Sequence, residues 1–126
     1  MATTSDSRSL ATLLATGRLA IGIATSAFPE LGARSWLGEH GRGPAGRVLG
    51  RALGARDLAL AIGALTARED DAQFRRWVRL GAFADAADAF ATVLNWRSLP
   101  RASRIGVFTV AAGAAALGAV LGQAER

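Results

Sequence analysis

The sequence is organised around one apolar run, residues Leu80 to Trp96, which is long enough to cross a lipid bilayer and yet contains two aspartates near its middle. On a helical wheel of 100° per residue, one narrow stripe carries the polar and smallest side chains, namely Gly81, Asp85, Asp88, Thr92 and Asn95. The opposite side is apolar and consists of Phe83, Ala87, Phe90, Val93 and Leu94. Trp77 and Trp96 bracket the run with about 28 Å of helix between them, close to the thickness of the hydrocarbon layer. The pattern predicts a transmembrane helix whose polar stripe faces the inside of a bundle.

Three other apolar runs are also of membrane-spanning length. They are residues 9–28 with Arg18 at the centre, residues 47–67 with Arg56 and Asp57 near the middle, and residues 105–122 without any charged side chain. With a further span at residues 78–96, the sequence predicts an all-α, integral membrane, antiparallel four-helix bundle that forms one domain over residues 1–126. The connecting segments 29–46, 68–76 and 97–104 are rich in glycine, proline or charge and are expected to be loops. A soluble four-helix protein is the alternative fold, but it leaves the uncharged fourth run unexplained.

Composition narrows the chemistry further. The chain has no cysteine and a single histidine, so disulfides and thiolate metal sites are excluded, and no metal or other cofactor is expected. The net charge of +5 comes from arginines that are scattered along the chain, and nucleic acid is therefore not an expected partner. Every basic residue is arginine, which together with the many alanines and glycines is typical of a GC-rich bacterial genome. The expected location is a bacterial inner membrane, crossed several times, with the lipid bilayer as partner. The arginines of the two membrane sides are balanced, so orientation is not predicted.

Five ionisable residues are expected at the same depth because each lies near the middle of its helix. They are Arg18, Arg56, Asp57, Asp85 and Asp88. Charges at the centre of a bilayer are costly unless they pair or contact water, so these side chains should form a network or line a wet cavity. Three carboxylates face two arginines, and the unmatched one, Asp85 or Asp88, is the candidate to hold a proton. Small or polar residues on the same faces are expected to line the pocket: Gly81, Thr92, Asn95 and Thr25.

Two functional hypotheses follow from this cluster, and a third is weaker. In the first, the protein is transporter-like, or binds a small ligand or ion at mid-membrane through the five charged residues. In the second, it is an accessory or assembly subunit of a larger membrane complex, and the cluster only fixes the register of the helices. The third is a membrane-embedded enzyme that holds a divalent cation between Asp85 and Asp88, but the neighbouring arginines repel a metal. An enzyme is therefore the less expected class.

Stripes of small residues predict close helix contacts and a homo-oligomer. One stripe is formed by Gly50, Gly54, Asp57, Ala61 and Ala64, and another by Ala111, Ala115, Gly118 and Gly122. Each contains a G-x-x-x-G step, the spacing at which two helix backbones approach each other closely.

Two stretches resemble known membrane proteins. The segment GRALGARDLALAIGAL at residues 50–65, followed by GAFADAADAF at residues 81–90, resembles a group of small, uncharacterised four-helix membrane proteins of GC-rich bacteria. The segment TGRLAIGIATSAFPELGARSWLG at residues 16–38 is similar to the opening of DoxX-like membrane proteins. The resemblance implies a four-span architecture with the five charged residues as its polar signature. It implies no activity.

Overall fold

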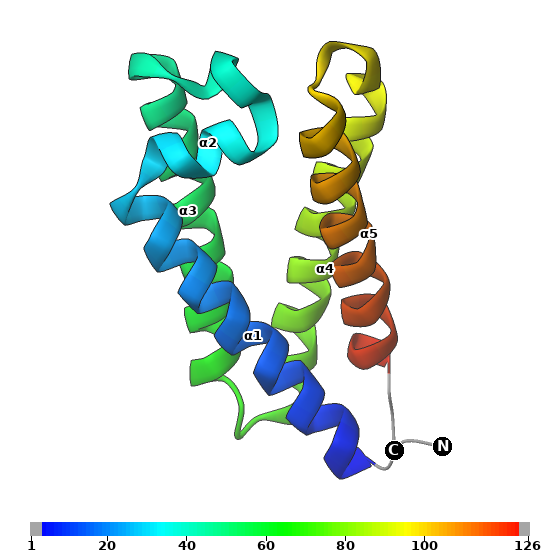
Figure 1. Ribbon diagram of the computed structural model, residues 1–126. Coiled ribbons are helices and arrows are strands. Elements are labelled where there is room, and N and C mark those ends of the chain that lie inside the picture. Colours follow the sequence, from blue (N-terminus) through cyan, green and yellow to red (C-terminus); the bar gives the residue numbers. More distant parts are fainter. Residues whose placement is uncertain (1–3, 124–126) are drawn as a thin grey trace.

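The computed structural model describes residues 4–123, and over this range the chain is entirely helical, without a strand (Figure 1). The all-α class is therefore confirmed. The α-helices are α1 (Thr4–Ala27), α2 (Pro29–Leu37), α3 (Gly43–Thr66), α4 (Asp71–Leu94) and α5 (Arg101–Gln123). Two short 3₁₀ helices, η1 (Gly38–Gly41) and η2 (Trp96–Ser98), lie in the connections.

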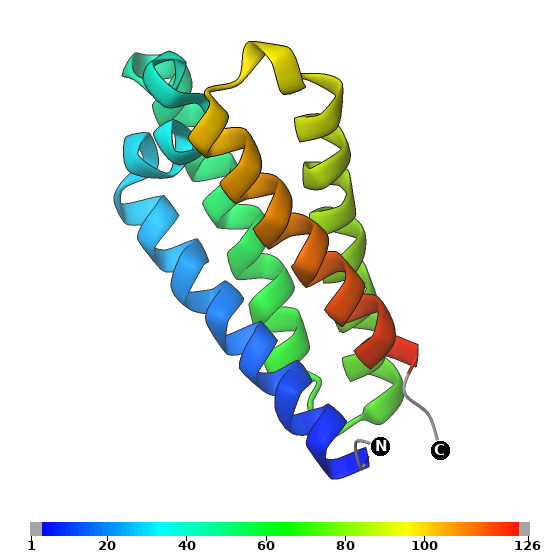
Figure 2. The same cartoon turned by 45° about the vertical axis from the view of Figure 1, so that its right-hand side comes forward.

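The four long helices form two antiparallel pairs. Helix α1 packs along α3, and α4 packs along α5. The beginning of α1 and the end of α5 lie at the same end of the bundle (Figure 2). The pairs meet near this end and diverge toward the other, where α2 crosses above α1 and α3 (Figure 1). The chain thus runs up and down alternately, as expected for a bundle with short connections.

The connections contain more helix than the sequence analysis expected. Residues 29–37 were expected to be a loop, but they form α2, which begins with Pro29 and Glu30 in its first turn, where both residue types favour a helix. Helix α4 begins at Asp71, so the expected loop at 68–76 is wrong for its last six residues. The Asp70 carboxylate accepts a hydrogen bond from the backbone N–H of Gln73 at 3.0 Å and caps this helix.

Glycines bring α3 into backbone contact with α1. A Cβ added to Gly54 would lie 2.4 Å from Ser26 Oγ and 2.8 Å from the Ser26 backbone nitrogen. A Cβ on Gly50 would lie 2.0 Å from the carbonyl oxygen of Pro29. The predicted stripe of α3 is buried along its whole length, which confirms its inward orientation. On α5, Gly118 and Gly122 likewise pack against α4. These stripes pack within the chain, so they are not free to form the predicted homo-oligomer, which stays a prediction.

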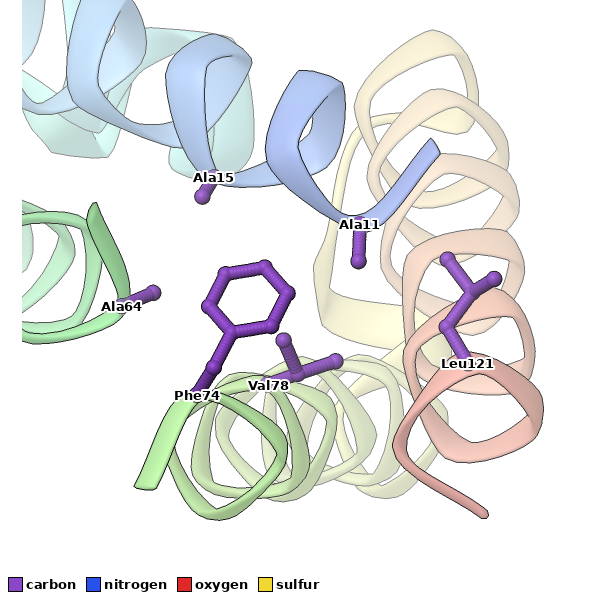
Figure 3. Packing of buried hydrophobic residues seen from close by; sticks show 6 residues of the cluster. All are labelled: Ala11, Ala15, Ala64, Phe74, Val78 and Leu121. Atoms are coloured by element: carbon purple, nitrogen blue, oxygen red, sulfur yellow. The ribbon is translucent and has the colours of Figure 1, made fainter. Parts of the chain in front are cut away.

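The hydrophobic core is small and lies near the end where the helix pairs meet (Figure 3). The ring of Phe74 from α4 fills the space between alanines of α1 and α3, beside Val78 and Leu121 (Figure 3). The side chain of Trp77 packs over Gly63 of α3. The other bracketing tryptophan, Trp96, makes an edge-to-face contact with Phe108, with ring centroids 5.9 Å apart.

Large apolar side chains lie mainly on the outside. Within residues 4–123, eight of the eleven buried hydrophobic residues are alanines, whereas eighteen large hydrophobic residues are exposed. On α4, Phe83 is 74% exposed and Phe90 is 64% exposed, as the helical wheel predicted. Within residues 4–123, two segments are long and apolar enough to cross a membrane, Ser5–Ala27 and Arg101–Gln123. Helices α3 and α4 are long enough but carry more charge, so the four-span membrane bundle stays a prediction.

Candidate functional site

The five charged side chains singled out in the sequence form one connected network in the interior. Arg18 comes from α1, Arg56 and Asp57 from α3, and Asp85 and Asp88 from α4. Acids and bases alternate along the network in the order Asp85, Arg18, Asp57, Arg56, Asp88. The common depth of these residues, inferred from their helix positions, is what allows three helices to contribute to one network.

Arg18 joins three helices. Its Nη1 donates to Asp57 Oδ1 at 3.0 Å, and its Nη2 pairs with Asp85 Oδ2 and lies 3.5 Å from the carbonyl oxygen of Gly81. The side chains of Arg18, Asp57 and Asp85 are only 10–12% exposed. The guanidinium lies directly over Gly81, where an added Cβ would be 3.4 Å from Arg18 Nη2, an ordinary van der Waals contact. Arg18 is thus the central, buried cation of the network.

Arg56 forms a two-pronged bond with Asp88. Its Nη1 donates to Asp88 Oδ1 at 2.8 Å and its Nη2 to Asp88 Oδ2 at 2.8 Å, the geometry in which guanidinium and carboxylate bind most strongly. Nη2 also contacts Asp57 Oδ1 at 3.3 Å, so this oxygen is shared by both arginines. The third donor, Arg56 Nε, is buried and has no acceptor within the described part of the chain.

The network is negatively charged and retains unused acceptors. Three aspartates and two arginines leave one formal negative charge. Among residues 4–123, no hydrogen bond reaches Asp57 Oδ2 or Asp85 Oδ1, whereas both oxygens of Asp88 are bound by Arg56. Further binding capacity therefore lies with Asp57 and Asp85, in the form of acceptor oxygens.

A cavity of about 740 Å³ opens onto this network between α1 and α5. Its charged floor is formed by all five residues of the network. Its walls are mostly apolar and include Leu10, Leu13, Leu14, Gly17 and Ile21 of α1 and Gly106, Val107, Val110, Ala114 and Leu117 of α5. Ser35 and Ser103 add two hydroxyl groups to the lining. The cavity follows α5 from Ala102 to Leu117, about 22 Å of helix, and is therefore a long groove.

The smaller residues expected to line the pocket lie elsewhere. Gly81 is buried beneath Arg18. Thr92 is fully buried; its Oγ1 accepts from Trp36 Nε1 at 3.1 Å and donates to the carbonyl oxygen of Asp88 at 2.8 Å. Thr25 packs against Gly32 at the start of α2. A helical wheel shows that these residues point inward, but it does not show that α2 fills that part of the interior.

Asn95, the fourth of these residues, follows the last turn of α4. Its side-chain amide donates to the carbonyl oxygen of Ala91 at 2.9 Å, and it lines a separate cavity of about 410 Å³ beside Trp36 and His40. The apolar wall on α5 was not identified from the sequence, because the run 105–122 has no charged residue to mark the face that lines a site, and its polar residue Thr109 does not line the groove. The wall includes Gly106, where an added Cβ would meet no atom within 4 Å.

The geometry offers no metal centre within the described residues. No group of three or more histidine, aspartate or glutamate side chains is placed to hold an ion over residues 4–123. Asp85 and Asp88, the pair considered for a divalent cation, are bound by different arginines.

A separate, exposed ion pair lies outside the long helices, where Arg42 Nε is 2.5 Å from Glu39 Oε2. The hydrogen bond from Arg42 lowers the pKa of Glu39 below its usual value.

Comparison with known proteins returns no match among protein-family models, curated proteins or solved structures. The resemblance to small four-helix membrane proteins and to the DoxX-like opening therefore remains a prediction from short motifs.

Proposed function

We propose that the protein is a multi-pass protein of the bacterial inner membrane that binds a small ligand or ion at the charged floor of the groove between α1 and α5, in a transporter-like manner. Membrane insertion is supported by the distribution of side chains, since large apolar groups face outward and small residues fill the interior. A core helix of a soluble protein is mostly buried, but only 17% of the apolar window of α1 and 22% of that of α5 is buried.

The observation that carries the proposal is the contact of the charged network with a groove of about 740 Å³. Ligand pockets typically measure about 300–1,000 Å³ and combine apolar walls with a few polar groups. Ionisable groups in a membrane interior are expensive, and they usually mark the path of a substrate or ion. A purely structural network needs no groove of this size above it.

The positions of the ion pairs suggest how binding is coupled to movement. The Arg18–Asp85 and Arg56–Asp88 pairs connect the α1/α3 pair to the α4/α5 pair. A ligand that competes for these aspartates weakens the connection between the two helix pairs. Transporters commonly change access by moving one bundle relative to another around a fixed site.

A second candidate, an accessory subunit of a membrane complex, is favoured by the completeness of the ion pairing. Both arginines are already bound by aspartates, and large apolar surfaces are available for a partner. Native mass spectrometry from mild detergent separates the two candidates. An unrelated membrane protein that copurifies in fixed ratio supports the accessory function, whereas a clean homo-oligomer or monomer contradicts it.

Single introduced cysteines test the proposed groove, because the natural chain has none. Ala114 lines the groove, and Ala116 lies two residues further along α5, is exposed and does not line it. In intact membranes, a hydrophilic maleimide should label the Ala114→Cys variant through the wet groove and leave Ala116→Cys unlabelled in lipid. Labelling of both variants would contradict membrane insertion at this depth, and labelling of neither would contradict a water-accessible groove.

A further inference from the structure

We propose that the ligand of this groove is a single-chain amphiphile with a cationic head group, in chemical terms an alkylammonium ion. This inference rests on the proposed function and specifies the ligand of the same site. Charge, unused hydrogen-bonding capacity and shape each support it.

Charge favours a cation. The network has one negative charge in excess, so a monovalent cation neutralises it, whereas an anion raises the excess to two. In a membrane interior an uncompensated charge is strongly disfavoured, and the gain from neutralisation is correspondingly large.

The unused hydrogen-bonding groups also favour a cation over an anion. The oxygens Asp57 Oδ2 and Asp85 Oδ1 receive no hydrogen bond from residues 4–123, and both residues line the groove. The side chain of Asp85 is nine-tenths buried, but its free oxygen is not among the fully buried atoms and is open to a ligand in the groove. An anion would need donors instead. The terminal nitrogens of both arginines already donate to aspartates, so an anion would depend on Arg18 Nε and Arg56 Nε, which have no acceptor among residues 4–123, and Arg56 Nε is buried.

Shape favours an alkyl chain over a compact ion. The groove follows about 22 Å of α5, and the network contacts only part of it. Leu10, Leu14 and Leu117 line the part nearer the end of the bundle where α1 begins and α5 ends. A head group at Asp57 and Asp85 therefore places the chain along these leucines. An inorganic cation would leave this apolar length empty.

Three decyl compounds with different head groups test the inference: decylammonium, decyl sulfonate and uncharged decanol. Native mass spectrometry of the full chain from maltoside micelles measures how much of each compound remains bound, and the shift in thermal unfolding temperature gives an independent readout. We expect decylammonium, whose head group can donate hydrogen bonds, to bind at least about tenfold more tightly than the other two.

Two variants with matched controls locate the binding. Asp85→Asn should weaken the binding of decylammonium about tenfold, whereas Asp71→Asn on the same helix, in an exposed pair with Arg8, should not. Gly106→Leu should block binding without unfolding the chain, since an added Cβ there meets nothing within 4 Å. Ala116→Leu, outside the groove, should bind as the natural chain does.

The outcomes separate the inference from the proposed function. If decyl sulfonate or decanol binds as well as the cation and Gly106→Leu abolishes that binding, the groove is a ligand site but the cationic class is wrong. If none of the three compounds binds, or if Gly106→Leu changes nothing, both the inference and the proposed ligand site are overturned.

Discussion

Replacing Arg18 with leucine tests the network most directly, because this one side chain bonds to both Asp57 and Asp85. The substitution leaves three buried or half-buried carboxylates against a single arginine, and the excess negative charge of the network rises from one to two. It also removes the connection that α1 makes to α4 through the network. We expect the free energy of unfolding to fall steeply.

The magnitude follows from burial. Removing one partner of a buried ion pair typically costs about 3–5 kcal/mol, because the remaining charge is left without compensation. Arg18 is 11% exposed, and its two aspartates are 12% and 10% exposed, so this range applies. Hydrogen bonds between transmembrane helices average only about 0.6 kcal/mol, but that value does not describe an unpaired charge.

Arg8 provides the control. It pairs with Asp71 at 2.6 Å, but the two side chains are 46% and 63% exposed, and exposed pairs contribute about 0.2–1 kcal/mol. Unfolding in mixed micelles of maltoside and dodecyl sulfate, followed by tryptophan fluorescence, measures both variants on the same scale. A loss for Arg18→Leu no larger than that for Arg8→Leu would refute the argument that the network is buried and mutually dependent.

A double substitution separates the lost pair from the lost packing. Arg18→Leu with Asp85→Leu returns the excess charge to one, so part of the stability should return. Adjacent charged residues in one network typically show interaction energies of about 0.5–3 kcal/mol in such cycles. Additive effects of the two substitutions would mean that the Arg18–Asp85 pair contributes nothing of its own.

Three further predictions concern positions around the network. Gly17→Ala should raise the free energy of unfolding by up to about 1 kcal/mol, because alanine favours helix and the added Cβ meets nothing. Gly54→Ala should lower the free energy of unfolding, because its Cβ clashes with Ser26. Equal effects of the two substitutions in the same unfolding assay would contradict the close packing of α1 on α3. Thr92→Val should cost about 1 kcal/mol, since it removes the acceptor for Trp36 Nε1. The carboxyl resonance of Glu39 should titrate below the ordinary value of about 4.3, so its small contribution to stability is present above that pH and is lost as the pH falls through the lowered pKa. Arg42→Gln should move this titration back up in ¹³C NMR.

Helical periodicity predicted the features that depend on one helix at a time. The polar stripe of α4 faces inward from Gly81 to Thr92, and its apolar side is exposed, as the wheel indicated. The glycine stripe of α3 is buried, and Asp57 bonds to a neighbouring helix. These features follow from the rotation of an α-helix by 100° per residue and from the free-energy cost of exposing or burying each side chain, both of which depend on the local sequence.

Features that depend on several helices could not be predicted in this way. The pairing of Arg56 with Asp88 and of Arg18 with Asp85 depends on the register between helices, which one sequence does not specify. The groove exists because the two helix pairs diverge, and residues 105–122 of α5 include no charged residue that marks the lining face. Helix α2 was missed because the glycine and proline content of residues 29–46 as a whole outweighed the favourable Pro29 and Glu30 at the start of the helix.

A structural role and a binding role for the five charged residues are compatible, and the geometry explains why. The network that joins the two helix pairs also forms the floor of the groove, so the same aspartates stabilise the bundle and face a ligand. Stability loss in Arg18→Leu therefore does not exclude a binding site. The informative comparison is between two variants. Asp85→Asn removes a charge that serves both the structural and the binding role, whereas Gly106→Leu fills the groove and changes no charged residue. A protein whose network is only structural would lose stability in the first variant and show no change in ligand retention in either.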